Sequence, residues 1–288
     1  MYLRTFIIVV ALFFTTTVTG QDSIVAENIF SHEIRDGSRT AMKHIIGQNT
    51  YNKAGKKVLQ IQYFDSIANI KTYTLFFYQD NQLVSKETFT GEKSLISIER
   101  FSYTDMSKIK ESKLYEPLDD QMQNTITTRC FYTDTALSKK IVFGRNGKRI
   151  RQISYEYKPE QLTEITLYKK GGQEENLKSV KVISVFSENR ITSKSIDNLS
   201  FEKTRGHYSV EYSYNIETGK LISEIWYDEK PELIKTIRYR WDIDGTLRDR
   251  GLVDGAGNYI EFISYKRENY VVNLGNQQMF DLSNPVTR

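Results

Sequence analysis

The sequence predicts an all-β fold: an antiparallel meander of about nine hairpin repeats that forms either a curled open sheet or a closed barrel. Three observations support this prediction. Aromatic residues return at a nearly constant spacing, short turn sequences follow many of them, and stretches of alternating polar and apolar residues lie between them. We find no amphipathic helical pattern long enough to supply the crossover helices of a parallel sheet.

The clearest copy of the repeat covers residues 210–228. Val210, Tyr212 and Tyr214 alternate with polar residues, which places them on one face of a strand. A turn sequence that contains Gly219 follows, and glycine accepts the positive φ that tight turns require. A second apolar run, rich in Ile and aromatic residues, is followed by another turn sequence. The copy therefore predicts a β-hairpin and its link to the next hairpin.

One aromatic residue closes the first strand of each copy and marks the repeat. Successive markers are 24 to 29 residues apart, which suits two strands of ordinary length joined by short turns. The copies share few other identities, so a non-repetitive β-sandwich is the alternative fold. The markers are Tyr51, Tyr78, Tyr103, Tyr132, Tyr157, Phe186, Tyr214, Trp241 and Tyr265.

Two pieces of the repeat, YNxxxGKL from Tyr214 and WDxxGxL from Trp241, carry a family resemblance. They resemble the YD-type (RHS-like) repeats of bacterial cell-surface proteins. The chain is also similar to secreted β-meander proteins of unknown function in Gram-negative bacteria, whose sheets can curl into a porin-like barrel. The resemblance covers residues 45–270 and implies a β-hairpin repeat fold. It implies no catalytic, cofactor-binding or metal-binding residue.

Residues 1–20 are predicted to be a signal peptide. Arg4 precedes a nine-residue apolar core, residues 6–14, which is too short to span a bilayer. Small or modest residues precede a predicted cleavage site before Gln21. No cysteine follows the apolar core, which argues against a lipid-modified N-terminus. We therefore expect an exported protein that is periplasmic, at the cell surface or extracellular.

The remaining chain divides into three predicted parts. Residues 21–44 do not fit the repeat and are expected to cap it, with a short helix or an edge strand over residues 24–34. Residues 45–270 form the β-hairpin repeat domain. Residues 271–288 lose the pattern and are expected to form a last strand and a loose tail.

Charge and composition exclude some classes of function. The net charge is only +4, and basic and acidic residues are interspersed, which does not suit a nucleic-acid interface. A small basic cluster at Lys53, Lys56 and Lys57 is interpreted as a charged turn. The strand face opposite the aromatic markers carries Lys, Arg and Glu, so we expect that the chain does not span a membrane after signal cleavage.

The sequence DIDGTL, residues 242–247, matches the nucleophile motif of HAD-type phosphatases. That motif belongs at the end of the first strand of a parallel α/β domain, and only 41 residues follow it here. We interpret Asp242 and Asp244 as part of a hairpin turn. A calcium site is the weaker alternative, because these residues and Asp249 supply few of the oxygens that Ca²⁺ requires.

Other residues of chemical interest also receive structural interpretations: the histidines as surface or hydrogen-bonded side chains, the cysteine as a small buried apolar residue, and the aspartate pair and the glycines as turn residues. The histidines lack metal-ligand spacing, the single cysteine has no nearby histidine to act as a base, and no helix follows the glycines to hold a phosphate. The residues considered are His32, His44, His207, Cys130, Asp119, Asp120, Gly251, Gly255 and Gly257.

These observations predict no catalytic site and no cofactor or metal. We expect an exported, non-enzymatic protein that acts in binding or scaffolding at the cell envelope. A glycan, a peptide or an envelope protein is the expected partner, because exposed tyrosines offer broad contact area. The alternatives are a structural component of an outer-membrane assembly and a hydrolase with a site inside a barrel.

Overall fold

The computed structural model describes residues 22–64, 69–119, 121–169, 177–199 and 206–272. In these ranges all regular secondary structure is β-strand, in one sheet of 18 strands. No helix in the described ranges is long and apolar enough to cross a membrane. The strands are β1 (Asp22–Arg35), β2 (Ser38–Tyr51), β3 (Lys57–Tyr63), β4 (Ile70–Gln79), β5 (Gln82–Thr90), β6 (Leu95–Tyr103), β7 (Ile109–Leu118), β8 (Gln121–Thr133), β9 (Ala136–Gly144), β10 (Arg149–Lys158), β11 (Gln161–Lys169), β12 (Leu177–Ser187), β13 (Arg190–Leu199), β14 (Gly206–Tyr214), β15 (Leu221–Tyr227), β16 (Leu233–Trp241), β17 (Leu247–Asp254) and β18 (Tyr259–Val272).

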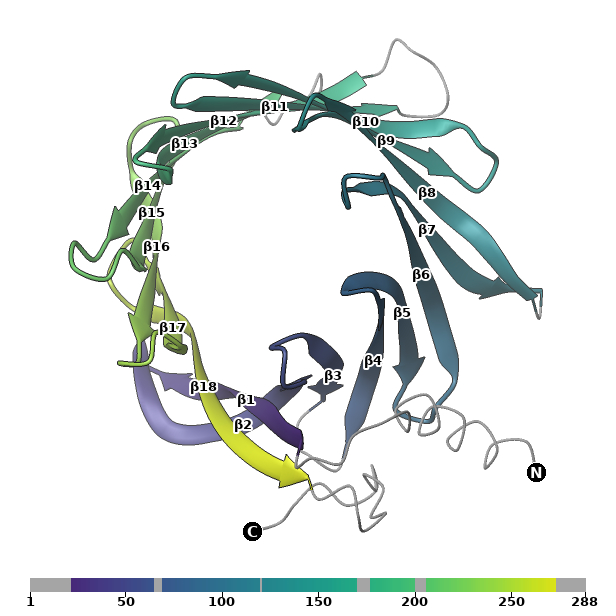
Figure 1. The fold of residues 1–288 in the computed structure, drawn as a ribbon. Helices are drawn as coiled ribbons and strands as arrows, with labels where there is room; N and C mark the ends of the chain where they lie inside the picture. The colour runs from purple at the N-terminus through teal and green to yellow at the C-terminus, as the bar shows by residue number, and fades with distance from the viewer. Residues whose placement is uncertain (1–21, 65–68, 120, 170–176, 200–205, 273–288) are drawn as a thin grey trace.

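The sheet closes into a barrel. Each strand pairs antiparallel with its neighbours in sequence, and β1 also pairs with β18, from Asp22 opposite Val272 to Ser31 opposite Ile263. Figure 1 shows the resulting ring of strands. The predicted all-β meander is confirmed, and of its two predicted forms the closed one is observed. Among the 18 described strands, closure leaves no unpaired sheet edge at which another chain could add a strand.

The clearest sequence repeat folds as predicted. It forms β14, a turn, and β15, and the β15 bounds coincide with the second apolar run. Val210 is completely buried, and Gly219 has a φ of 67° in the turn. Asn215 closes this turn by donating its backbone N–H to the carbonyl of Lys220 at 2.8 Å.

A β-bulge accompanies most of the marker aromatics. The pairing register shifts by one residue immediately before each of seven of them, where the strand meets its hairpin turn. Bulges increase the local right-handed twist, and twist and bending are what a wide sheet needs in order to close. The seven aromatics are Tyr51, Tyr78, Tyr103, Tyr132, Phe186, Tyr214 and Trp241.

The N-terminal segment differs from its prediction. Residues 24–34 lie in β1, a 14-residue strand, and not in a helix. Nor is β1 an edge strand, because it pairs with both β2 and β18. The expected boundary at residue 45 falls inside β2. The physical reason is closure: a meander of this width is completed by two long strands that join its ends.

The apolar core is thin. Among the described residues, only Val210 and Val253 are large side chains less than 2% exposed. Barrels of 16–18 strands are too wide for side chains to fill, in contrast to eight-stranded barrels. Most side chains on both faces are accordingly half-buried, and stability must be distributed along the ring of strands.

Some predictions concern residues outside the described ranges. These are the signal peptide at residues 1–20 and the tail beyond Val272. They remain predictions.

Candidate functional site

Eight hairpin turns and the two ends of the strand region lie at one rim of the barrel, which we call the aromatic rim. The turns join β2–β3, β4–β5, β6–β7, β8–β9, β10–β11, β12–β13, β14–β15 and β16–β17. Eight of the nine marker aromatics stand at these turns. Tyr265 is the exception, because it lies inside β18 opposite Ile29 of β1.

Six of the rim aromatics donate a side-chain hydrogen bond to the preceding hairpin. In each case the acceptor is a backbone carbonyl at the start of the neighbouring strand. The bonds are Tyr78 Oη to Lys57 O (2.9 Å), Tyr103 Oη to Leu83 O (2.7 Å), Tyr132 Oη to Ile109 O (2.9 Å), Tyr157 Oη to Leu137 O (3.1 Å), Tyr214 Oη to Ile191 O (2.9 Å) and Trp241 Nε1 to Leu221 O (2.7 Å).

The acceptors follow one rule. Leu83 pairs with Tyr78 across the β4–β5 hairpin, and the carbonyl of Leu83 accepts the hydroxyl of Tyr103 from the next hairpin. Each aromatic thus bonds to the pairing partner of the previous aromatic. This arrangement, which we call the aromatic ladder, joins successive repeats by bonds that no single hairpin could make. Only Tyr or Trp, among the aromatics found at this repeat position, has the donor that such a bond needs.

Lysines in the longer turns reinforce the ladder. The Lys56 ammonium lies 5.1 Å from the Tyr78 ring centroid and donates to the Asn81 carbonyl at 3.0 Å. The Lys220 ammonium lies 5.0 Å from the Trp241 ring and donates to the Gly245 carbonyl at 3.2 Å. Of the predicted basic cluster, Lys53 and Lys56 lie in the β2–β3 turn, as predicted, with Lys56 contacting the next hairpin, whereas Lys57 is the first residue of β3.

The ladder is interrupted at Phe186. By the rule above, this side chain would bond to the carbonyl of Leu162, the pairing partner of Tyr157, but phenylalanine has no donor. The two hairpin turns beside Phe186, residues 159–160 and 188–189, contain no lysine that could contact its ring. A pocket of about 420 Å³ lies at this interruption. We call it the rim pocket.

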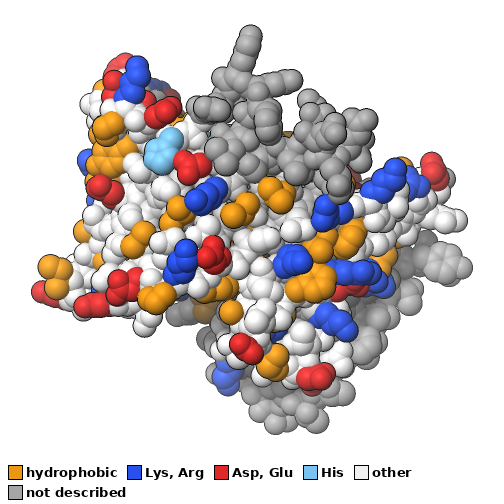
Figure 2. Space-filling view, turned by 90° about the horizontal axis from the view of Figure 1, so that it is seen from above, with side chains coloured by type: hydrophobic (Ala, Val, Ile, Leu, Met, Phe, Trp, Pro, Cys, Tyr) orange, Lys and Arg blue, Asp and Glu red, His pale blue; other side chains and the backbone are white. Residues whose placement is uncertain are grey.

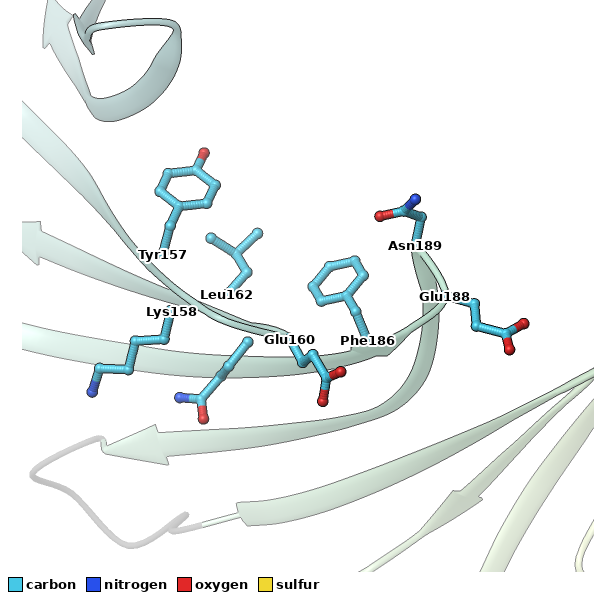
Figure 3. A pocket seen from close by; sticks show the side chains of 8 residues that line it. Tyr157, Lys158, Glu160, Leu162, Phe186, Glu188 and Asn189 are labelled. Atoms are coloured by element: carbon cyan, nitrogen blue, oxygen red, sulfur yellow. The ribbon is translucent and has the colours of Figure 1, made fainter.

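Figure 3 shows how the rim pocket is built. Tyr157, Leu162, Phe186 and Asn189 project from one side of the sheet, the side toward which its strands curve, whereas Lys158 points to the other side. Tyr157 is 52% exposed. The Glu160 carboxylate lies on the side of the sheet opposite the aromatic rings, and the Glu188 carboxylate points away from them (Figure 3); Gln161 completes the lining.

A second pocket lies on the opposite face of the sheet, over β15–β18. It has a volume of about 390 Å³. Arg240 lies directly before Trp241 in β16, so its side chain is on the face opposite the aromatic ladder. We call this the arginine pocket. Its lining residues are Ile222, Ser223, Arg238, Tyr239, Arg240, Asp249, Gly251, Tyr259 and Phe262.

A buried carboxylate joins the strands where the barrel closes. Glu27 of β1 accepts hydrogen bonds from Arg267 of β18 (2.9 Å) and from Asn49 (3.0 Å) and Tyr51 (3.2 Å) of β2. Burial acts to raise the pKa of Glu27, but these hydrogen bonds and the Arg267 charge outweigh it and hold the pKa below its usual value. Burial and the Glu27 charge raise the pKa of Tyr51 to about 12.

The phosphatase-like motif forms a hairpin turn between β16 and β17, as predicted. The Asp242 N–H donates to the Thr246 carbonyl at 2.8 Å, and Gly245 has a φ of 79°. Asp244 Oδ1 accepts from both the N–H (2.8 Å) and the hydroxyl (2.7 Å) of Thr246. Asp249 is in β17, where Arg240 and Arg248 bind its carboxylate.

The histidines and the cysteine are not brought together. His32 bonds Ser264 at 2.8 Å, His44 is exposed, and His207 pairs with Asp197. Cys130 is half-buried in β8, where burial raises the pKa of its thiol and the charge of Lys140 opposes that shift. Within the described ranges, no group of three or more His, Cys, Asp or Glu side chains could hold a metal ion.

The predicted turn residues have mixed outcomes. Asp119, Gly255 and Gly257 lie in turns, and Asp120 is outside the described residues. Gly251 was expected in a turn, but it lies inside β17 and pairs with Arg238 and Phe262. The prediction for Gly251 is wrong because a close approach of side chains, not a turn, requires glycine there.

Comparisons with known proteins add similarity of fold only. No protein-family model and no curated protein matches this chain. Among solved structures, a porin-like protein from Bacteroides uniformis is 10% identical with a TM-score of 0.44, covering 88% of this chain and 98% of that one. A porin-like protein from Bacteroides vulgatus is 8% identical with a TM-score of 0.40, covering 83% and 96%.

A third similar structure is the complex TcdB2-TccC3-TEV. It is 15% identical with a TM-score of 0.33, and the match covers 77% of this chain but 12% of that chain. At these scores a shared function does not follow, and the functional argument rests on the chain's own residues.

Proposed function

We propose that this chain is an exported, non-enzymatic β-barrel of the cell envelope that binds a glycan in the rim pocket. The observation that carries the proposal is the exposed Tyr157 beside Phe186, at the one interruption of the aromatic ladder among the described rim hairpins. Elsewhere in the ladder the aromatic side chains join neighbouring hairpins. Here Phe186 makes no such bond, and its ring and the exposed ring of Tyr157, which keeps its own bond to the Leu137 carbonyl, line the rim pocket.

The chemistry of the rim pocket suits a sugar. Aromatic rings offer a flat apolar surface on which the C–H face of a pyranose can stack. The Asn189 amide, which lies on the same side as the aromatic rings, supplies both a donor and an acceptor for sugar hydroxyls, and Glu160 and Glu188 stand at the edge of the pocket. Convergent polar groups around an apolar floor are typical of small-ligand sites.

Export is supported by the sequence alone. Residues 6–14 form the apolar core of the predicted signal peptide, and the basic Arg4 precedes it. N-terminal sequencing of the protein recovered from an envelope fraction tests this part of the proposal. A mature chain that begins at Gln21 supports it, and a retained Met1 contradicts it.

We further propose that the barrel does not span a membrane. Spanning barrels present a continuous apolar band to lipid. Here the face opposite the aromatics carries Glu111, which pairs with Lys113 at 3.0 Å and with Arg129 at 2.9 Å. Figure 2 shows one side of the molecule, on which basic and acidic side chains lie between apolar ones. Partition of the protein after a carbonate wash of membranes tests this part.

Glycan binding is tested by titrating the purified protein with neutral trisaccharides such as cellotriose, maltotriose and chitotriose. We expect one of them to bind, and Tyr157→Ala to weaken its binding at least tenfold, because stacking contributes most of the contact. Tyr208→Ala is the matched control, since Tyr208 is also exposed, at 39%, but does not line the pocket. Equal losses in the two variants, or no binding of any probe, would contradict the proposal.

The same titration separates binding from hydrolysis. A binding protein returns the trisaccharide intact after prolonged incubation, whereas a hydrolase releases shorter sugars. If shorter sugars appear, Glu160→Gln and Glu188→Gln identify whether the carboxylates of the rim pocket are responsible. If the chain is captured in a stable envelope complex and binds no sugar, the result would favour the alternative that it is a structural component of an outer-membrane assembly.

A further inference from the structure

The arginine pocket has a surplus of positive charge. The carboxylate of Asp249, whose side chain is only 7% exposed, accepts from Arg240 Nε at 2.6 Å and from Arg248 Nε at 3.2 Å. Within the described ranges, Arg238 forms no ion pair and no side-chain hydrogen bond. Asp249 therefore pairs with two arginines, while Arg238, which also lines the pocket, has no acidic partner among the described residues.

A fourth guanidinium approaches from the β1–β2 hairpin. The Arg39 Cζ atom lies 4.4 Å from the Phe262 ring centroid, and the Arg240 Cζ atom lies 5.7 Å from the same centroid. Two cations on one aromatic ring repel each other, and only one of them has an acidic partner. A bound anion would relieve this repulsion.

Aromatic rings form the floor of the arginine pocket. Phe262 is 3% exposed and contacts the edge of Tyr259, with ring centroids 5.7 Å apart. The Tyr259 ring lies against the backbone of Gly251, where a Cβ atom would stand 2.7 Å from Tyr259 Cε1. Glycine at this position thus admits the ring and shapes the pocket.

We propose that the arginine pocket binds an acidic sugar unit. Arg238 and Arg39 would bind its carboxylate, for which the planar guanidinium has the matching geometry. Tyr259 would contact the apolar face of the sugar ring. This site is on the face opposite the rim pocket, and the proposal does not depend on glycan binding at the rim.

The test is calorimetric titration of the full mature protein with trigalacturonate, at low and at physiological ionic strength. Its neutral methyl ester and galactotriose serve as uncharged probes. We expect trigalacturonate to bind at least about tenfold more tightly than either neutral probe, with affinity falling as salt rises. Arg238→Gln and Arg39→Gln should each weaken binding by about tenfold or more.

Arg145→Gln is the matched control, because it removes the same charge from an exposed arginine in the β9–β10 turn. It should leave binding unchanged, and so should Tyr157→Ala in the rim pocket. Equal weakening by Arg145→Gln would show a non-specific charge effect and overturn the proposal. Binding of inorganic phosphate or sulfate as tight as that of trigalacturonate would overturn the assignment to a sugar. Thermal unfolding of each variant confirms that Arg238→Gln and Arg39→Gln are folded.

Discussion

Arg267 in the last strand donates a hydrogen bond from Nε to Oε1 of Glu27 in the first strand, at 2.9 Å across 240 residues of sequence. The other carboxylate oxygen of Glu27 accepts from Asn49 and Tyr51 of β2. One buried side chain therefore holds three strands together where the meander closes into a ring. Closure depends on the backbone pairing of β1 with β18 and on this polar group at its centre.

Glu27→Ala is expected to lower the free energy of unfolding by about 2 kcal/mol, because it leaves the buried Asn49 amide without its acceptor and removes the charge-assisted bond of Arg267, whose side chain is 43% exposed. Urea unfolding followed by circular dichroism measures the change. The matched control is Glu156→Ala, which breaks an exposed ion pair with Lys158 and should cost less than about 1 kcal/mol. Equal costs in the two variants would show that Glu27 does not hold the closure.

The stability of the barrel should also depend on pH through Glu27. Its pKa is lower in the folded protein than its usual value, so the folded state binds the proton less readily than the unfolded state. The stabilisation is fully present above the unfolded pKa of about 4.3 and is lost as pH falls through the folded pKa. Unfolding free energies of the natural protein and of Glu27→Gln should therefore converge at low pH. A difference that is constant from neutral pH to acid would contradict this assignment.

Much of the barrel could be predicted because its repeat is local. Tyr78 and Tyr103 each close a strand before a polar turn, and both facts are visible within a few residues of sequence. The alternation of Val210, Tyr212 and Tyr214 likewise fixes one face of a strand without reference to the rest of the chain. Such short-range patterns determine hairpins, and consecutive hairpins determine a meander.

Closure and the pockets could not be predicted in the same way. Residues 22–35 have no local feature that distinguishes an edge strand from a closing strand, because the partner β18 lies at the other end of the sequence. The rim pocket lies where Phe186 lacks the hydroxyl of the other ladder aromatics. The acceptor that the ladder rule would give it, the Leu162 carbonyl, can be identified only from the strand pairing. Arg39 of β2 lies over the Phe262 ring of β18 only after the barrel has closed.

The aromatic ladder predicts a specific cost for losing a hydroxyl. Tyr103→Phe removes the 2.7 Å bond to the Leu83 carbonyl while keeping the ring. We expect it to lower the free energy of unfolding by about 1 kcal/mol, the usual contribution of one hydrogen bond. Tyr115→Phe is the control, because Tyr115 stands in β7 away from the aromatic rim and makes no ladder bond. If Tyr103→Phe leaves the free energy of unfolding unchanged, this ladder bond contributes no stability.

The turn at residues 242–246 should behave as a turn and not as a metal site. Asp244 is held by Thr246, whose backbone N–H and hydroxyl lower the pKa of the carboxyl group. We expect Asp244→Ala to lower the melting temperature equally with and without Mg²⁺ or Ca²⁺, because the aspartate acts on the backbone. A phosphate-ester hydrolysis assay should give the same background rate for the natural protein and for Asp242→Asn. A metal-dependent rise in melting temperature that Asp244→Ala abolishes would overturn the turn interpretation.

Phe186→Tyr links the stability of the ladder to the proposed function. The added hydroxyl would stand where the other ladder aromatics place theirs and could donate to the Leu162 carbonyl, adding up to about 1 kcal/mol to the free energy of unfolding. The same hydroxyl would join the two hairpins around the rim pocket and narrow it, so trisaccharide binding should weaken. Tyr214→Phe, at the next hairpin, is the opposite substitution and should destabilise the barrel without changing binding, because Tyr214 does not line the pocket. If Phe186→Tyr stabilises the protein but leaves binding intact, the ladder rule holds and the rim pocket is not the glycan site.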